Sequence, residues 1–216
     1  RVCPGYWFRE ALTGGKTVLR SRLLMLGAAA GLLLGGTAAG SASASTASIW
    51  KVVPSANPQA SLVTNSDFLS VSMGSVNDGW AVGQFMDSTA LGHPLTEHWD
   101  GSRWARVSAP EPTGDQAGLA GVDELGPDNA WAVGTSAEGA AGEGNINDEP
   151  LIEHWDGSGW TIVPGASLPA GATGDLEAVG GTGPADLWAV GFTLSADDAQ
   201  EQVLFEHFDG STWQIA

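Results

Sequence analysis

Short apolar runs separated by turn-forming residues fill the chain after about residue 50, and these runs repeat. The tetrapeptide Trp-Ala-Val-Gly occurs three times. A hexapeptide Glu-His-(Trp/Phe)-Asp-Gly-Ser follows each copy, with a further tryptophan two positions beyond it. The tetrapeptides begin at Trp80, Trp131 and Trp188, the hexapeptides at Glu97, Glu153 and Glu206, and the further tryptophans are Trp104, Trp160 and Trp213. Self-similarity at a spacing of about 55 residues predicts a repeat architecture.

Each repeat resolves into four short strands. An apolar segment such as residues 119–122 precedes a turn rich in Asn, Asp and Gly, and the Trp-Ala-Val-Gly strand follows. In the third strand the side chains alternate, so Glu153 and Trp155 share one face while His154 faces the other way. Asp-Gly then predicts a tight hairpin into a fourth strand that begins with tryptophan. No helical periodicity appears after the first 44 residues.

Four antiparallel strands with large apolar groups on both faces are typical of a propeller blade, which is sandwiched between two neighbours. The sequence therefore predicts an all-β fold, a β-propeller fragment of three four-stranded blades over residues 67–109, 117–164 and 175–216. Residues 50–54 match the start of a fourth strand, 160–164, without the three strands that should precede it. We expect an orphan N-terminal strand there, and a natural chain that continues past Ala216 for several more blades.

These motifs resemble kelch-type blades, and more closely the secreted bacterial repeats that read VWAVG, then IEHW(D/N)G, then SWxxVPSP, a family of uncharacterised function. The resemblance covers residues 50–216. It departs from kelch blades at Gly83, Gly134 and Gly191, single glycines where kelch blades usually carry two. The resemblance implies a fold and little about activity, because propellers include enzymes, adhesins and scaffolds.

The first 44 residues have the order of a secretory signal peptide. Arg20 and Arg22 precede an apolar run over residues 23–34, and small residues follow through Ala44. A membrane anchor is the alternative, but the run is short and diluted by Gly and Ala. We expect a leader over 1–44 and a mature domain over 45–216 that is secreted to the outside or the surface of a bacterium.

The charge of the chain limits the partners that it is expected to bind. The chain has 25 acidic and 8 basic residues, and only Lys51, Arg103 and Arg106 of the bases follow residue 44. Over residues 45–216, 3 basic minus 24 acidic residues give a formal net charge of −21. Such an acidic, tryptophan-rich domain is not expected to bind nucleic acid or an anionic membrane surface.

Residue types also exclude some chemistries. Cys3 and Tyr6 are the only Cys and Tyr, and both precede residue 45. A mature chain without them has no disulfide, no Tyr-Cys copper site and no tyrosine nucleophile of the sialidase type. We favour a non-catalytic extracellular binding or cell-surface scaffold module for an unknown protein or carbohydrate. A carbohydrate-active enzyme, a glycoside hydrolase or lyase with an unidentified carboxylate pair, stays open as the alternative.

The repeated polar and aromatic residues have a structural interpretation. His98, His154 and His207 invite a metal hypothesis, but equivalent positions on different blades do not converge on one ion. We predict structural roles for these histidines and for the six tryptophans named above, although exposed indoles could also stack on sugars. The three glutamates are expected to accept hydrogen bonds from a neighbouring blade.

The longest loop contains the one candidate cation site. Asn145, Asn147, Asp148 and Glu149 could donate oxygens to a weakly bound calcium ion if the loop folds back on itself. No other cofactor is expected, and no catalytic residue is assigned. Asp87 and the other loop acids are interpreted as solubilising surface.

Overall fold

The computed structural model describes residues 51–56, 63–113, 116–138, 147–195 and 201–216. Strands are the only regular elements in these ranges, so none of these residues forms a helix that could cross a membrane. All twelve strands belong to one compact unit that includes Val53–Ala216.

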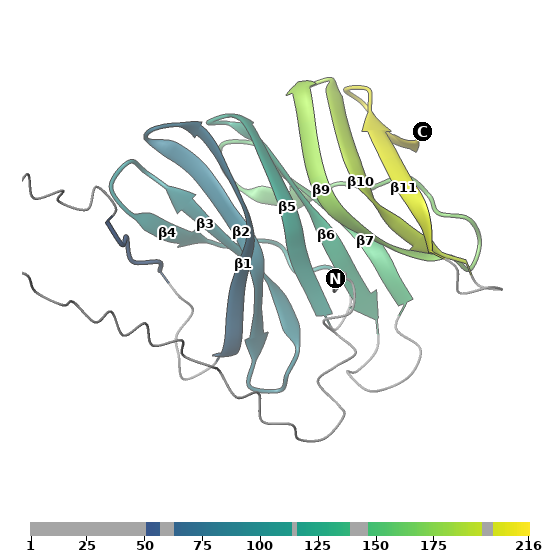
Figure 1. The fold of residues 1–216 in the computed structure, drawn as a ribbon, viewed down its shortest axis with the longest axis horizontal. Coiled ribbons are helices and arrows are strands. Elements are labelled where there is room, and N and C mark those ends of the chain that lie inside the picture. Colours follow the sequence, from purple (N-terminus) through teal and green to yellow (C-terminus); the bar gives the residue numbers. More distant parts are fainter. Residues whose placement is uncertain (1–50, 57–62, 114–115, 139–146, 196–200) are drawn as a thin grey trace, which may run out of the picture. The chain divides into compact units, whose positions relative to one another are not determined.

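Each repeat forms one four-stranded antiparallel sheet in which strands neighbouring in sequence are neighbours in space (Figure 1). Blade 1 consists of β1 (Val63–Ser75), β2 (Asp78–Asp87), β3 (Gly92–Trp99) and β4 (Trp104–Val107). Blade 2 consists of β5 (Gln116–Gly126), β6 (Asn129–Glu138), β7 (Asn147–Trp155) and β8 (Trp160–Ile162). Blade 3 consists of β9 (Thr173–Gly183), β10 (Asp186–Leu194), β11 (Glu201–Phe208) and β12 (Trp213–Ile215).

The Asp-Gly-Ser turn joins the third and fourth strands of every blade by the same hydrogen bonds. In blade 1, Asp100 Oδ1 accepts from the Ser102 amide (2.9 Å), the Ser102 hydroxyl (2.6 Å) and the Arg103 amide (3.0 Å). These bonds, the Ser102 hydroxyl foremost, lower the pKa of Asp100 to about 2. Gly101 adopts a φ of 88°, a conformation that favours glycine. The motif is therefore a turn signal.

The hydrophobic core lies between the sheets. We call "leading" the face of a blade that meets the preceding blade, and "trailing" the face that meets the next. The leading face of blade 2 carries Leu119, Val122, Ala132, Leu151, Glu153, Trp155 and Trp160, and the trailing face of blade 1 carries Trp80, Val82, Thr96 and His98. Trp80 packs between Trp155 and Trp160, with ring centroids 4.8 Å from each.

The seam between blades 2 and 3 repeats this arrangement. Trp131 from the trailing face of blade 2 lies 4.9 Å from Phe208 and 5.7 Å from Trp213 on the leading face of blade 3. A second cluster of buried apolar residues surrounds them. The all-β prediction is thus confirmed: the chain contains three four-stranded blades of a β-propeller stacked face to face.

The orphan strand expected at residues 50–54 has no ladder partner in the described part of the chain, and it stays a prediction. Trp50 lies outside the described residues, and residues 51–56 form no strand. The four strands of each sheet all come from a single repeat, and residues 51–54 are exposed and have no ladder partner. A segment without a hydrogen-bonding neighbour has no reason to stay in a β-ladder, because water satisfies its backbone equally well.

Candidate functional site

The three repeated histidines lie in the same environment in three separate sheets. Each ring packs against the tryptophan of its own Trp-Ala-Val-Gly strand, with centroids 4.3 to 4.7 Å apart. Each Nε2 also lies within hydrogen-bond distance of a turn side chain of the same blade. The distances are 2.6 Å from His98 to Asp78, 3.0 Å from His154 to Asn129 and 2.9 Å from His207 to Asp186. Burial lowers the pKa of His154. This geometry supports a structural role, because each histidine contacts its own blade.

The repeated glutamates are buried on the leading faces and reach toward the linker that precedes their blade. The Ser55 hydroxyl donates to Glu97 Oε1 (2.8 Å), and the Ala166 amide donates to Glu206 Oε2 (2.9 Å). Their partners are therefore linker groups, where the sequence predicted a neighbouring blade.

Glu153 differs from the other two glutamates. It is 0% exposed, and neither carboxyl oxygen has a hydrogen-bond partner among the described residues. Pro110 occupies the linker position that Ala166 occupies in the next repeat, and proline has no N–H to donate. Burial, with a contribution from the charge of Glu111, raises the pKa of Glu153 to about 8.

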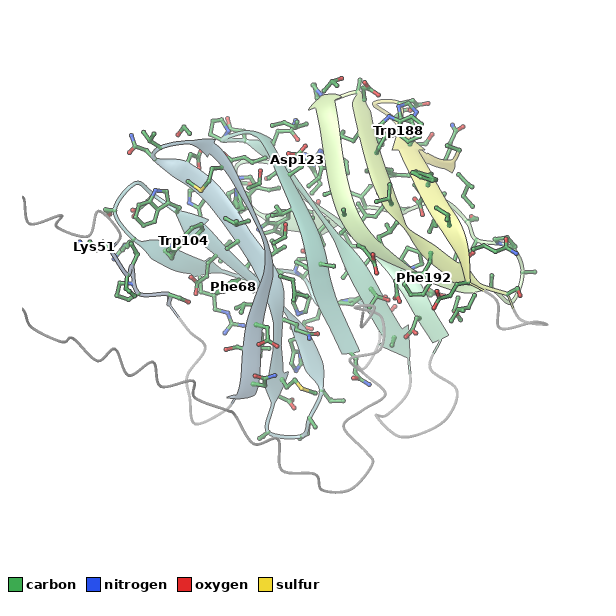
Figure 2. The ribbon with its side chains drawn as sticks, in the orientation of Figure 1. Lys51, Phe68, Trp104, Asp123, Trp188 and Phe192 are labelled. Atoms are coloured by element: carbon green, nitrogen blue, oxygen red, sulfur yellow. The ribbon has the colours of Figure 1, made fainter. Side chains whose placement is uncertain are left out.

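The two end faces of the stack expose apolar side chains that are covered between the blades. Val71 on the leading face of blade 1 is 60% exposed, whereas its equivalent Val122 is 7% exposed. Trp188 on the trailing face of blade 3 is 43% exposed, whereas its equivalent Trp131 is 4% exposed. Figure 2 labels Trp188 on the third sheet, and Phe68 and Trp104 on the first. Trp188 is therefore partly exposed, because no described segment covers this face.

A polar cluster in blade 1 has no counterpart in the other repeats. His93 Nδ1 lies 3.1 Å from Glu111 Oε2, and His93 Nε2 lies 3.3 Å from Asp87 Oδ2. Phe85 stacks on the His93 ring with centroids 4.9 Å apart, and the Arg106 guanidinium lies 4.4 Å from the Phe85 centroid. Blade 2 has Ser136, Glu149 and Ile162 in place of Phe85, His93 and Arg106, and blade 3 has Thr193, Gln202 and Ile215. Blade packing does not require this cluster.

A pocket of about 340 Å³ adjoins the cluster, and its lining consists of Pro94, Arg106, Ser108, Ala109 and Glu111. Arg106 forms no ion pair with any of the described carboxylates. The pocket thus combines a charged donor, a hydroxyl and a carboxylate acceptor.

Asp87 is fixed in place behind His93. Its carboxylate accepts from the Thr89 hydroxyl (2.7 Å), the Thr89 amide (2.8 Å) and the Leu91 amide (3.0 Å). These bonds, the Thr89 hydroxyl first, lower the pKa of Asp87 well below its usual range. The imidazole of His93 therefore lies between the ordered carboxylate of Asp87 and the more exposed carboxylate of Glu111.

Sequence reasoning missed this site. The residues that recur in every repeat are those that form the fold. His93 and Arg106 can be recognised only because they depart from the repeat. The signal that could have revealed the site is that blade 1 has Arg106 where blades 2 and 3 both have isoleucine.

The predicted calcium loop lies largely outside the described residues, which exclude Asn145. Asn147 is the first residue of β7, opposite Glu138, and Asp148 and Glu149 follow it in the strand. Successive strand residues point to opposite faces, so Asp148 and Glu149 are not presented to one ion. In the described part of the chain no group of three His, Cys, Asp or Glu is placed to hold a metal ion. The calcium site stays a prediction.

No family model matches the chain, and no curated protein matches it. Among solved structures the chain is similar to "YCF48 bound to D1 peptide", with 14% identity and a TM-score of 0.38 over 76% of this chain. The chain spans 59% of the length of that structure. Its class rests on the sheets themselves: three stacked four-stranded meanders are β-propeller blades. The kelch-like family stays a prediction.

Proposed function

We propose that this chain is a non-catalytic extracellular binding module that holds a carbohydrate in the pocket beside His93. The observation that carries the proposal is the non-repeating cluster of polar and aromatic side chains around that pocket. In a repeat protein the recurring residues maintain the stack, so a constellation confined to one repeat is free to serve a ligand.

The chemistry of the pocket favours a polyhydroxylated ligand. Sugar hydroxyls both donate and accept hydrogen bonds, and the lining offers the Arg106 guanidinium and the Ser108 hydroxyl as donors with Glu111 as acceptor. The stack of Arg106 on Phe85 and of Phe85 on His93 holds the guanidinium in place and limits the entropy lost on binding. The arginine pair and small residues of the leader support an extracellular location.

Calorimetric titration of the full chain with neutral and uronic-acid oligosaccharides tests this proposal. Arg106→Ala should weaken binding about tenfold or more, since a hydrogen bond to a charged group contributes roughly 1.5 to 3 kcal/mol. Arg103→Ala is the matched control, because Arg103 is exposed, three residues away and paired with Asp100 (3.4 Å) outside the pocket lining. Equal affinities of the two variants would contradict the assignment of the pocket.

A carbohydrate-active hydrolase is the second candidate, and one observation favours it: the His93 imidazole lies between two carboxylates beside the pocket. Such an arrangement can pass a proton to a leaving group. The discriminating measurement is the release of reducing ends from the same oligosaccharides. Release by the wild type that Glu111→Gln abolishes would replace the binding proposal with the enzyme, whereas binding without release supports the module.

A further inference from the structure

We propose that the sugar held beside His93 is a uronic acid, and that Arg106 selects it by binding its carboxylate. This inference rests on the proposed function and goes beyond it, because it names the charged group of the ligand and the residue that recognises this group.

Arg106 is one of only three basic residues after residue 44, where the chain has 24 acidic residues. The other two are Lys51 and Arg103, and Arg103 pairs with Asp100 at 3.4 Å. Arg106 forms no ion pair with the described carboxylates. Its positive charge is therefore available to an anionic group that a ligand brings, and charge-assisted hydrogen bonds are about twice as strong as neutral ones.

The fold does not require a charge at this position. Ile162 and Ile215 occupy it on the fourth strands of blades 2 and 3, where they are 42% and 46% exposed. An apolar residue therefore completes the fourth strand in both of the other repeats. The guanidinium of Arg106 is a departure that blade packing does not explain.

The pocket lies at a rim of the sheet that stays open when a blade is covered. Blade 1 covers the leading face of blade 2, yet Ile162 and Glu149, the equivalents of Arg106 and His93, are exposed there. The pocket lining itself comes from β3, β4 and the linker that leads to blade 2. A blade docked on the leading face of blade 1 would therefore leave Arg106 accessible to a ligand.

Stacking holds the guanidinium at the pocket. The Arg106 Cζ lies 4.4 Å from the Phe85 ring centroid, and Phe85 stacks on His93 with 23° between the ring planes. The contacts of His93 with Asp87 and Glu111 fix the imidazole in turn. A stacked arginine still presents the N–H groups of its planar fork, which match the two oxygens of a carboxylate. Because the side chain is already held, little conformational entropy is lost on binding.

Ser108 and Glu111 complement the arginine in the pocket lining. The Ser108 hydroxyl donates to the Ala109 carbonyl at 3.5 Å, a long hydrogen bond, so it can turn toward a ligand oxygen. Glu111 lies 3.1 Å from His93 Nδ1, and a carboxylate has about four acceptor sites, so Glu111 can also accept from a sugar hydroxyl. A uronic acid supplies both a carboxylate and hydroxyls, whereas a neutral sugar supplies only hydroxyls.

The acidity of the whole chain does not oppose this ligand strongly. Exposed charges more than about 8 Å apart are largely screened at physiological salt. A single carboxylate at Arg106 therefore meets little of the repulsion that a polyanion spread over the surface would meet.

Calorimetric titration of the full chain tests this specificity. The probes are trimers of galacturonic, glucuronic and mannuronic acid, each as the free acid and as its uncharged methyl ester. The wild type should bind at least one acid about fivefold or more tightly than its ester, because a held, bidentate arginine exceeds an ordinary exposed ion pair. Arg106→Ile should bind the acid and the ester within about twofold of each other. Arg103→Gln is the control and should keep the preference of the wild type.

Two variants keep the test independent of folding. Arg106→Ile copies the residue of blades 2 and 3, and Phe85→Ser copies Ser136 of blade 2, so the repeat already accepts both. Thermal unfolding at the temperature of the wild type would show that each is folded. Phe85→Ser keeps the charge of Arg106 but removes the ring on which it stacks, so the preference for the acid should shrink without disappearing.

The failure of this specificity differs from the failure of the proposed function. Equal binding of acid and ester by the wild type, or a preference that survives Arg106→Ile, would overturn the role of Arg106 and leave the carbohydrate module in place. Absence of binding by every acid, every ester and the neutral oligosaccharides would overturn the proposed function, and the uronic acid with it.

Discussion

Trp131 and Trp188 occupy the same position in consecutive blades, begin the same tetrapeptide and pack on equivalent histidines, His154 and His207. Yet 4% of Trp131 is exposed and 43% of Trp188. The difference comes from outside their own sheets. Phe208 and Trp213 of blade 3 cover Trp131, and no described residue plays that part for Trp188. Burial in this fold is therefore a property of the seam between two blades.

Truncation of either tryptophan should show how much the covering blade contributes to stability. Trp131→Ala should lower the free energy of unfolding by roughly 3 to 5 kcal/mol, because it leaves a cavity in a covered seam. Trp188→Ala should lower it by less than about 1.5 kcal/mol, because water already reaches the indole. Urea denaturation measures both, and equal losses would show that the seam does not decide burial.

Glu153 makes the seam between blades 1 and 2 differ from the next one, because it is the leading-face glutamate without a hydrogen-bond partner among the described residues. Its pKa is raised from 4.5 to about 8, so between these values the unfolded chain binds fewer protons than the folded chain. Stability must then fall as pH rises from about 4.5 to 8. Glu153→Gln should remove this fall and be more stable than the wild type at pH 8 by roughly 2 to 4 kcal/mol.

Urea denaturation at about pH 4, 6 and 8 checks this dependence. Glu177→Gln, which changes an exposed glutamate on β9, is the control and should follow the wild type. Parallel stability curves for the wild type and Glu153→Gln would show that this carboxyl has a partner in solution.

A smaller difference is expected between two glycines on the first strands of blades 2 and 3, β5 and β9. A Cβ on Gly121 would lie 2.8 Å from the Ala178 Cα and 2.9 Å from the Glu177 carbonyl oxygen, across the seam between blades 2 and 3. A Cβ on Gly180 of blade 3 meets nothing within 4 Å. Gly121→Ala should cost about 1 to 3 kcal/mol and Gly180→Ala less than about 0.5 kcal/mol. Thermal unfolding of both variants measures the difference, and an unaffected Gly121→Ala would mean that the blades are packed less closely.

The repeat made the fold predictable. Each Trp-Ala-Val-Gly forms the second strand of a blade and each Asp-Gly-Ser forms a hairpin, because strand alternation and turn chemistry are local properties. The orphan strand stays a prediction, because residues 51–54 match a strand in sequence while a strand also needs a ladder partner, which local sequence does not supply.

The candidate site was not predictable in the same way. Asp87, His93 and Glu111 are separated by up to 24 residues (111 minus 87), and only the hairpin of β2 and β3 with the following linker brings them together. The exposure of Trp188 could not be predicted from the sequence either, because its sequence neighbours are the same as those of the buried Trp131. Both properties depend on contacts between segments.

The order of the blades along the chain also means that each blade is synthesised before the blade that covers it. Trp80 lies on blade 1, but Trp160, which covers it, is synthesised 80 residues later (160 minus 80). At about 5 to 20 residues per second, this delay lasts roughly 4 to 16 seconds. During that interval blade 1 presents a tryptophan to water and to every other nascent chain on the same messenger. Each new blade thus protects the one made before it, and the newest is always the one most exposed to aggregation.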